Sequence, residues 1–202
     1  MFVNKIALSF PSNIQNKKNI VTGNLLRRQI FETKSKHFES LNIRLPTIFI
    51  TGGNQGSFVL NKTITKILPI LTKNYFVIHQ TGNQTFTPSK NYLPFNFNND
   101  IGWILNKAEI IISRAGANTS QEIIALQKKS ILIPLKVSQQ DEQLKNAKLV
   151  KLKMPQQTII IPEVKLTPKI LLKNINQLFN IPNVKQIETK INYSLLKLIK
   201  TL

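Results

Sequence analysis

The chain has 202 residues, 42% of them hydrophobic, which suits one domain of generous size or one domain with appended segments. It contains no run of 18 apolar residues, which excludes a predicted transmembrane helix, and its start, MFVNKIALSF, lacks the features of a signal peptide, so we expect a cytoplasmic protein. The lack of cysteine excludes disulfides and thiol chemistry, and two histidines cannot build a histidine-rich metal site, so we expect no structural metal.

The net charge of +19 allows more than one functional interpretation. A strongly basic chain suits a nucleic-acid-binding protein or a protein that rests on an anionic membrane, where each Lys or Arg contributes roughly 1 kcal/mol. The lysines are scattered, and the aromatic residues are mostly Phe in apolar runs rather than base-stacking platforms, so the membrane surface is favoured over nucleic acid. A biased coding composition would produce the same charge without any function.

Apolar runs alternate with amphipathic stretches from residue 46 onward, whereas residues 1–45 are irregular and are predicted to be a lead-in. The predicted strands are 47–51, 75–79, 109–113, 131–135 and 158–161, and the predicted helices lie near 57–72, 100–107, 119–128, 140–151 and 168–179. A polar loop is expected through Tyr92, and a C-terminal amphipathic helix is expected at 181–202. This alternation predicts an α/β fold with a doubly wound, mainly parallel, Rossmann-like sheet.

A glycine-rich turn, TGGNQGS at 51–57, joins the first of these strands to its helix. Glycines let the backbone approach an anion closely, and the first N–H groups of a helix lack intrahelical partners, so the turn favours a phosphorylated ligand. Two further strand-turn-helix units, at 108–127 and 130–150, would open onto the same edge of a parallel sheet. On these residues alone, a tight turn that binds nothing remains open.

Five motifs occur along the chain in a fixed order: GNLLR at 23–27, TGGNQGS at 51–57, HQTG at 79–82, SRAGANTSQE at 113–122 and DEQLKNA at 141–147. Together they resemble the C-terminal, donor-binding half of the MurG-type N-acetylglucosaminyltransferases of glycosyltransferase family 28, which is one half of a GT-B architecture. The resemblance covers roughly residues 5 to 180 and implies that residues 46–180 bind a nucleotide sugar.

The resemblance also implies which residues bind the donor, UDP-N-acetylglucosamine. Glu122 matches a residue that accepts hydrogen bonds from the ribose hydroxyls, Gln143 matches one that binds the sugar hydroxyls, and Arg27 matches one near the phosphates. The full expected set is Arg27, Gly52, Gly53, Asn54, Gln55, Gly56, Asn98, Gly116, Ala117, Asn118, Thr119, Ser120, Gln121, Glu122 and Gln143.

The residues themselves leave other roles open for several members of this set. Thr119 suits a helix N-cap, and with Glu122 it has the spacing of a capping box. Gln143 lies three residues before Asn146, on one helix face that would suit solvent exposure, and Arg27 equally suits a surface position.

His79, Arg114 and Gln55 each allow a structural role as well as a role in the site. His79, at the end of a predicted strand, favours a packed and hydrogen-bonded histidine rather than a catalytic base. Arg114 and Gln55 suit either turn stabilisation or ligand contact.

The departures from the family pattern concern both the donor and the acceptor. Asn54, Asn98 and Asn118 replace the usual residues, which leaves donor selectivity open. The acceptor domain has no counterpart here beyond residues 1–25 or so, so no catalytic residue is expected in this chain.

The resemblance therefore implies a hexosyltransferase half that needs no cofactor or essential metal. It would transfer the sugar with inversion to lipid-linked muramyl-pentapeptide, a peptidoglycan precursor, only with an acceptor-domain partner chain, and it would lie at the inner face of the cell membrane. The alternatives are a truncated, non-catalytic nucleotide-sugar-binding remnant and, from charge alone, a nucleic-acid-binding protein.

Overall fold

The computed structural model describes a central α/β domain and parts of the lead-in. The described residues are 5–8, 16–22, 26, 28–31, 34–35, 38, 41–97, 100–135 and 141–182. Arg27, Asn98 and residues 183–202 of the expected C-terminal helix lie outside them.

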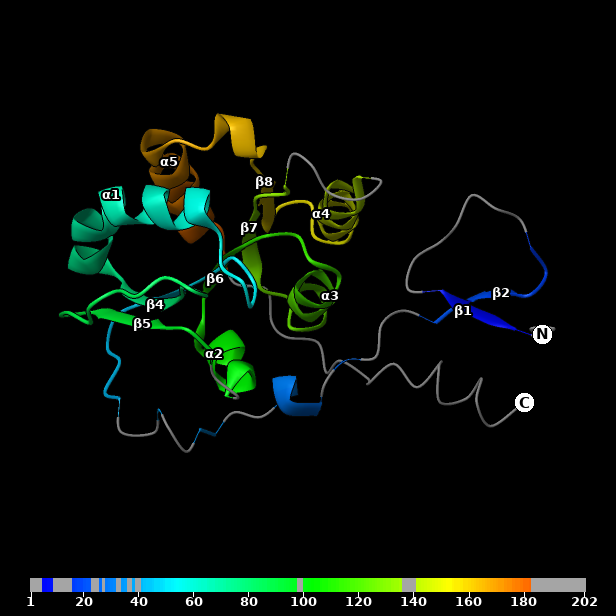
Figure 1. Ribbon diagram of the computed structural model, residues 1–202, viewed down its shortest axis with the longest axis horizontal. Coiled ribbons are helices and arrows are strands. Elements are labelled where there is room, and N and C mark those ends of the chain that lie inside the picture. The colour runs from blue at the N-terminus through cyan, green and yellow to red at the C-terminus, as the bar shows by residue number, and fades with distance from the viewer. Residues whose placement is uncertain are drawn as a thin grey trace.

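Six strands form one entirely parallel sheet in the order β5-β4-β3-β6-β7-β8 (Figure 1). Their bounds are β3 Thr47–Thr51, β4 Phe76–Gln80, β5 Tyr92–Phe95, β6 Ile110–Ser113, β7 Lys129–Leu132 and β8 Thr158–Ile160. The chain first builds outward from β3 to β5 and then returns to build from β6 to β8. The strand order therefore reverses between β3 and β6, and this switch point is where open α/β sheets form their ligand crevice.

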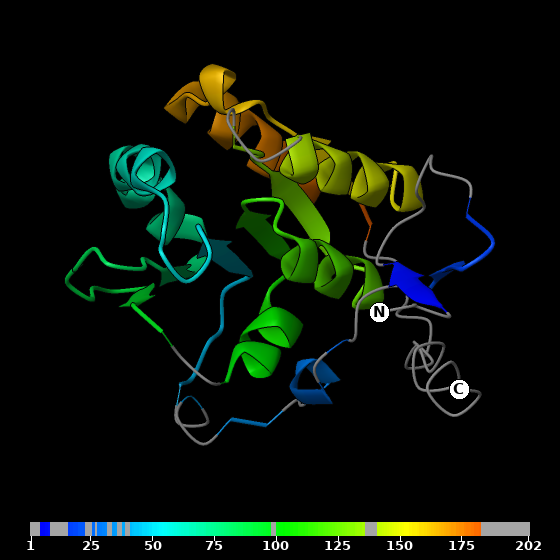
Figure 2. The ribbon, with the colours of Figure 1, turned by 45° about the vertical axis from the view of Figure 1, so that its right-hand side comes forward.

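Helices cover both faces of the sheet, as Figures 1 and 2 show. The α-helices are α1 Phe58–Asn74, α2 Ile101–Lys107, α3 Ala117–Ala125, α4 Glu142–Lys153 and α5 Pro168–Phe179. Alternate side chains of β3 enter different cores: Ile48 and Ile50 pack with α1 and α5, and Phe49 packs with α2, α3 and α4. The doubly wound fold predicted from the sequence is confirmed.

The lead-in contributes more to the domain than its irregular sequence suggests. Strands β1 Ile6–Leu8 and β2 Asn19–Val21 pair in parallel as a separate small sheet, and a 3-10 turn, η1 Arg28–Phe31, packs on α2. Ile30 and Phe38 are buried in the core with α2. At Gly102 of α2, an added Cβ would lie 1.7 Å from the Gln29 carbonyl oxygen, so glycine permits this close contact.

Strand β5 is the main error in the predicted elements, because the sequence suggested a polar loop through Tyr92. Pro94 interrupts the pattern, yet the strand tolerates it at the edge of the sheet. The carbonyls of Asn91 and Phe95 face β4, where they accept hydrogen bonds from Val77 (2.8 Å) and Thr81 (2.9 Å). The backbone of Pro94 therefore faces away from β4, so its missing N–H removes no hydrogen bond from the sheet.

No helix in the described part of the chain is long and apolar enough to cross a membrane.

Candidate functional site

The glycine-rich turn follows β3 directly and is held by its own short hydrogen bonds. Gly53 and Gly56 have φ angles of 82° and 76°, in the left-handed region that favours glycine. The Thr51 hydroxyl accepts a hydrogen bond from the Gly53 N–H (2.9 Å) and donates to Oε1 of Gln80 (2.8 Å). The Gly56 N–H donates to the Gly53 carbonyl (3.0 Å). The turn is thereby tied to the ends of both β3 and β4.

Glycines also allow the turns after β3 and β4 to touch through their backbones. A Cβ at Gly56 would lie 2.4 Å from the Thr81 carbonyl oxygen, and one at Gly82 would lie 2.3 Å from the Gly56 nitrogen. A Cβ at Gly52 would meet the Ser57 nitrogen at 2.4 Å. The HQTG and TGGNQGS segments therefore form one packed unit beside the switch point.

Arg114, at the end of β6, stabilises the start of α1. Its guanidinium donates to the Ser57 hydroxyl (2.6 Å) and to the Ile133 carbonyl (3.1 Å), and it pairs with the Glu163 carboxylate. Ser57 is the N-cap of α1, where its hydroxyl accepts from the Leu60 N–H (3.3 Å). Of the two roles left open for Arg114, these contacts favour turn stabilisation.

The N-terminus of α3 faces the glycine-rich turn without a side-chain cap. Gly116 is the N-cap residue, and the first intrahelical bond runs from the Ser120 N–H to its carbonyl (2.9 Å). The prediction that Thr119 caps the helix, alone or in a capping box with Glu122, is therefore wrong, because Thr119 lies inside the first turn. The first N–H groups of α3 and the positive end of its dipole remain oriented for an anion.

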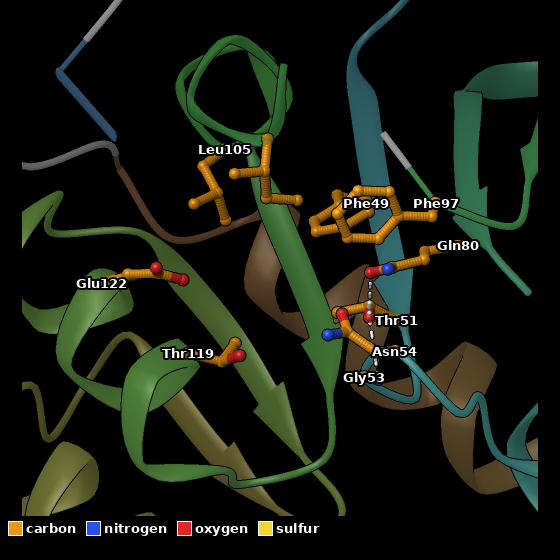
Figure 3. Close-up of a pocket in the computed structure, with 10 residues that line it drawn as sticks. Phe49, Thr51, Gly53, Asn54, Gln80, Phe97, Leu105, Thr119 and Glu122 are labelled. Carbon is orange, nitrogen blue, oxygen red and sulfur yellow. Dashed lines mark hydrogen bonds between the residues drawn. The ribbon is translucent and has the colours of Figure 1, made fainter. Parts of the chain in front are cut away.

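Two adjoining cavities occupy the switch point. An open cleft of about 610 Å³ is lined by Thr51, residues 52–59, Arg114, Gly116, Thr119, Leu135, Gln143 and Glu163. A smaller pocket of about 70 Å³ is lined by Phe49, Thr51, Gly53, Asn54, Gln80, Phe97, Ile101, Leu105, Thr119 and Glu122. In Figure 3, Thr119 and Glu122 extend from α3 on one side, opposite Asn54 and the rings of Phe49 and Phe97.

The structure brings most of the expected site residues to these cavities. Those that line them are Gly52, Gly53, Asn54, Gln55, Gly56, Gly116, Thr119, Glu122 and Gln143. Ala117, Asn118, Ser120 and Gln121 belong to the first turns of α3 but line neither cavity, and the Ser120 side chain is fully buried. Arg27 and Asn98 lie outside the described residues.

Sequence reasoning missed several residues that line the cavities. Thr51 and Gln80 are the last residues of β3 and β4, so their position at the carboxyl edge was a usable signal. Glu163 begins a 3-10 turn, η3 Glu163–Lys165, shortly after β8, and carries no motif. Phe49, Phe97 and Leu105 give the small pocket an apolar wall that resembles ordinary core in the sequence.

Gln143 and Asn146 lie near the start of α4 and connect this helix to the segments that follow β7 and β6. Gln143 is half-buried, and its Oε1 accepts a hydrogen bond from the Leu135 N–H (3.0 Å). Asn146 is buried and donates to the Ala115 carbonyl (3.0 Å). The Gln143 amide therefore lies at the cleft wall rather than on a solvated helix face.

His79 is a packed residue of β4, as the sequence favoured. Its ring lies 3.0 Å from the Tyr92 hydroxyl through Nδ1 and 3.1 Å from Oδ1 of Asn61 through Nε2. Asn61 donates through its amide nitrogen to two other oxygens, so Nε2 of His79 is the donor and Nδ1 accepts from Tyr92. Burial lowers the pKa of His79 to about 4, so the ring is neutral at pH 7.

Among the residues that the structure describes, no group of three or more His, Cys, Asp or Glu side chains is placed to hold a metal ion.

The chain is similar in sequence to several curated proteins. Curated relatives include UDP-N-acetylglucosamine--N-acetylmuramyl-(pentapeptide) pyrophosphoryl-undecaprenol N-acetylglucosamine transferases. The one from Clostridium novyi (strain NT) is 31% identical over 88% of this chain and 53% of its own length. The one from Prochlorococcus marinus (strain MIT 9312) is 31% identical over 98% of this chain and 55% of its own length. The chain thus spans about half the length of these relatives.

The solved structures share the fold. Acinetobacter baumannii MurG superposes with a TM-score of 0.68 at 21% identity, over 98% of this chain and 61% of that one. A kitacinnamycin glycosyltransferase superposes with a TM-score of 0.65 at 15% identity, over 93% of this chain and 46% of that one. The profile of the glycosyltransferase family 28 C-terminal domain matches residues 47–201. The chain therefore belongs to the glycosyltransferase family 28 C-terminal domain family, and its resemblance to MurG-type transferases is confirmed.

Proposed function

We propose that this chain binds UDP-N-acetylglucosamine and forms the donor half of a transferase that acts on a lipid-linked muramyl-pentapeptide. The observation that carries the proposal is the pair of joined cavities at the switch point. The cleft lies between the glycine-rich turn and the N-terminus of α3, and the smaller pocket beside it holds Glu122. The names of the curated relatives support the choice of donor and acceptor.

In this proposal each cavity receives one part of the donor. The diphosphate lies between the starts of α1 and α3, where two helix dipoles and backbone N–H groups favour negative charge. The uridine enters the smaller pocket, where the carboxylate of Glu122 accepts hydrogen bonds from the ribose and the base lies against Phe49 and Phe97. Gln143 binds the sugar hydroxyls, because an amide both donates and accepts.

The same arrangement supports transfer without a metal. As the acceptor displaces UDP from the sugar, negative charge grows on the leaving diphosphate, and preorganised helix N-termini stabilise that charge. The acceptor site and the general base come from a partner chain, so this chain alone does not turn over. The basic surface holds the assembly at the inner face of the membrane.

Calorimetric titration with UDP-N-acetylglucosamine, beside UDP-glucose, tests the donor site. Glu122→Gln keeps the side-chain volume but removes the charge, so we expect at least about tenfold weaker binding, since a hydrogen bond to a charged group contributes about 1.5–3 kcal/mol. Glu142→Gln, at an exposed residue, is the control and should bind as the unaltered chain does. If the folded, unaltered chain binds neither nucleotide sugar, the proposed function is wrong.

A second candidate is a nucleotide-sugar-binding remnant without activity, since the two cavities account for donor binding alone. Mixing the chain with a separately expressed acceptor domain distinguishes the two. Transfer of labelled N-acetylglucosamine to the lipid-linked acceptor supports the transferase half, and donor binding without any transfer supports the remnant.

A further inference from the structure

One guanidinium joins four segments at the carboxyl edge of the sheet. Arg114 follows β6, Ser57 precedes α1, Ile133 follows β7 and Glu163 follows β8, and Arg114 contacts all three of the others. Its side chain is 8% exposed, so it is almost entirely enclosed by these contacts. Arg114 therefore holds these segments together at the wall of the cleft.

The contact with Ser57 reaches the glycine-rich turn. Ser57 is both the N-cap of α1 and the residue against which the Gly52 backbone packs, with no room for a Cβ between them. Its hydroxyl receives hydrogen bonds from the Arg114 guanidinium and the Leu60 N–H. A displacement of Arg114 would thus move the start of α1 and, with it, the turn at 52–56.

Glu163 is an unexpected residue for this position. Its side chain is 17% exposed and lines the cleft, so it places a carboxylate on the wall of a cavity proposed to hold a diphosphate. Coulomb repulsion alone would make such a carboxylate weaken anion binding. Its direct contact with Arg114 gives it a different role.

We propose that Glu163 is a positioning residue for diphosphate binding. It orients the Arg114 guanidinium toward Ser57, and so fixes the glycine-rich turn and the start of α1 in the conformation that accepts the diphosphate. The inference rests on the proposed donor site for its effect on nucleotide binding. Its effect on the turn stands independently of that site.

The two possible roles of Glu163 predict opposite changes in UDP affinity, so Glu163→Gln distinguishes between them. If Glu163 only adds negative charge to the wall, its neutralisation tightens UDP binding. If it positions Arg114, UDP binds about tenfold more weakly while uridine, which lacks the diphosphate, binds unchanged. Glu142→Gln removes the same charge from an exposed residue next to Gln143 of the cleft, and should bind UDP as tightly as the unaltered chain or slightly more tightly.

Amide hydrogen exchange measures the turn directly and needs no ligand. Glu163→Gln should exchange faster at residues 52–60 than the unaltered chain, and Glu142→Gln should not. Glu163→Asp keeps the charge, so it should recover part of the protection from exchange and part of the UDP affinity. It provides the test if Glu163→Gln does not fold. Unchanged exchange, or tighter UDP binding by Glu163→Gln, overturns the inference. Failure of the unaltered chain to bind UDP refutes the donor site and leaves the exchange result to decide the role of Glu163.

Discussion

Replacement of two glycines in the same turn by alanine separates backbone strain from loop packing. Gly53 and Gly56 both have positive φ angles, 82° and 76°, so Ala costs about 1–2 kcal/mol of stability at either residue. A Cβ at Gly53 meets nothing within 4 Å, whereas at Gly56 it lies 2.4 Å from the Thr81 carbonyl oxygen. Real Cβ contacts essentially never fall below 3.0 Å, so the two turns must separate at residue 56.

The expected magnitudes follow from this difference in space. Gly53→Ala should lower the free energy of unfolding by about 1–2 kcal/mol, from strain alone. Gly56→Ala should lower it by about 2–5 kcal/mol, because overpacking against a neighbouring backbone adds about 1–3 kcal/mol. We expect Gly56→Ala also to weaken UDP binding more than Gly53→Ala, since only it displaces the turn from β4.

Urea unfolding followed by the fluorescence of Trp103, the sole tryptophan, measures both variants. Its ring stacks on Phe38 at a centroid distance of 5.2 Å, so it reports loss of the core on the α2 side. Equal destabilisation by the two substitutions would refute the packing argument, because it would mean that the contact between the turns contributes nothing beyond backbone strain.

Three other predictions test the core, the start of α3 and the start of α4. Burial lowers the pKa of His79 from 6.5 to about 4, so protonation favours the unfolded chain. The His79 contribution to stability should be complete above pH 7 and should fall by about 1.4 kcal/mol per pH unit between pH 6.5 and 4. In urea unfolding at different pH values, the His79→Gln variant should lack this fall in stability, and the His37→Gln variant should retain it. Gly116→Asp should cap α3 and raise the free energy of unfolding by about 0.5 kcal/mol, yet weaken UDP binding in calorimetry, because the carboxylate would occupy the anion site. Asn146→Ala should cost about 1–3 kcal/mol in urea unfolding, since it removes a buried hydrogen bond to a carbonyl, and the exposed Lys145→Ala should change stability by less than about 0.5 kcal/mol.

The fold was predictable because a parallel sheet covered on both faces needs nearly continuous apolar strands. Runs such as TIFIT in β3 and IIIS in β6 therefore stand out between amphipathic helices. Strand β5 does not, because YLPF is short, contains proline and lies in a polar stretch. Its place in the sheet depends on pairing with β4, which no local pattern reveals.

The location of the candidate site was predictable where a strand-to-helix turn has its own local motif. The glycine-rich turn and the start of α3 are such segments, since strand-to-helix turns carry their geometry in sequence. The prediction that Thr119 caps α3 was wrong because a Thr-x-x-Glu pattern also occurs within the first turn of a helix, and here Gly116 is the N-cap. The contact of Arg114 with Glu163 joins residues 49 apart and depends on where β8 lies in the sheet, so sequence spacing gave no sign of it.

The edge strand β5 also has a consequence for the solubility of the chain. Its residues that face away from β4 are Tyr92, whose N–H already donates to the Ser89 carbonyl (3.0 Å), and Pro94, which has no N–H. A strand from another copy would find no free donor on β5, so the sheet resists edge-to-edge aggregation at this side. The open edge of the sheet at β5 is thus protected against the addition of a further strand.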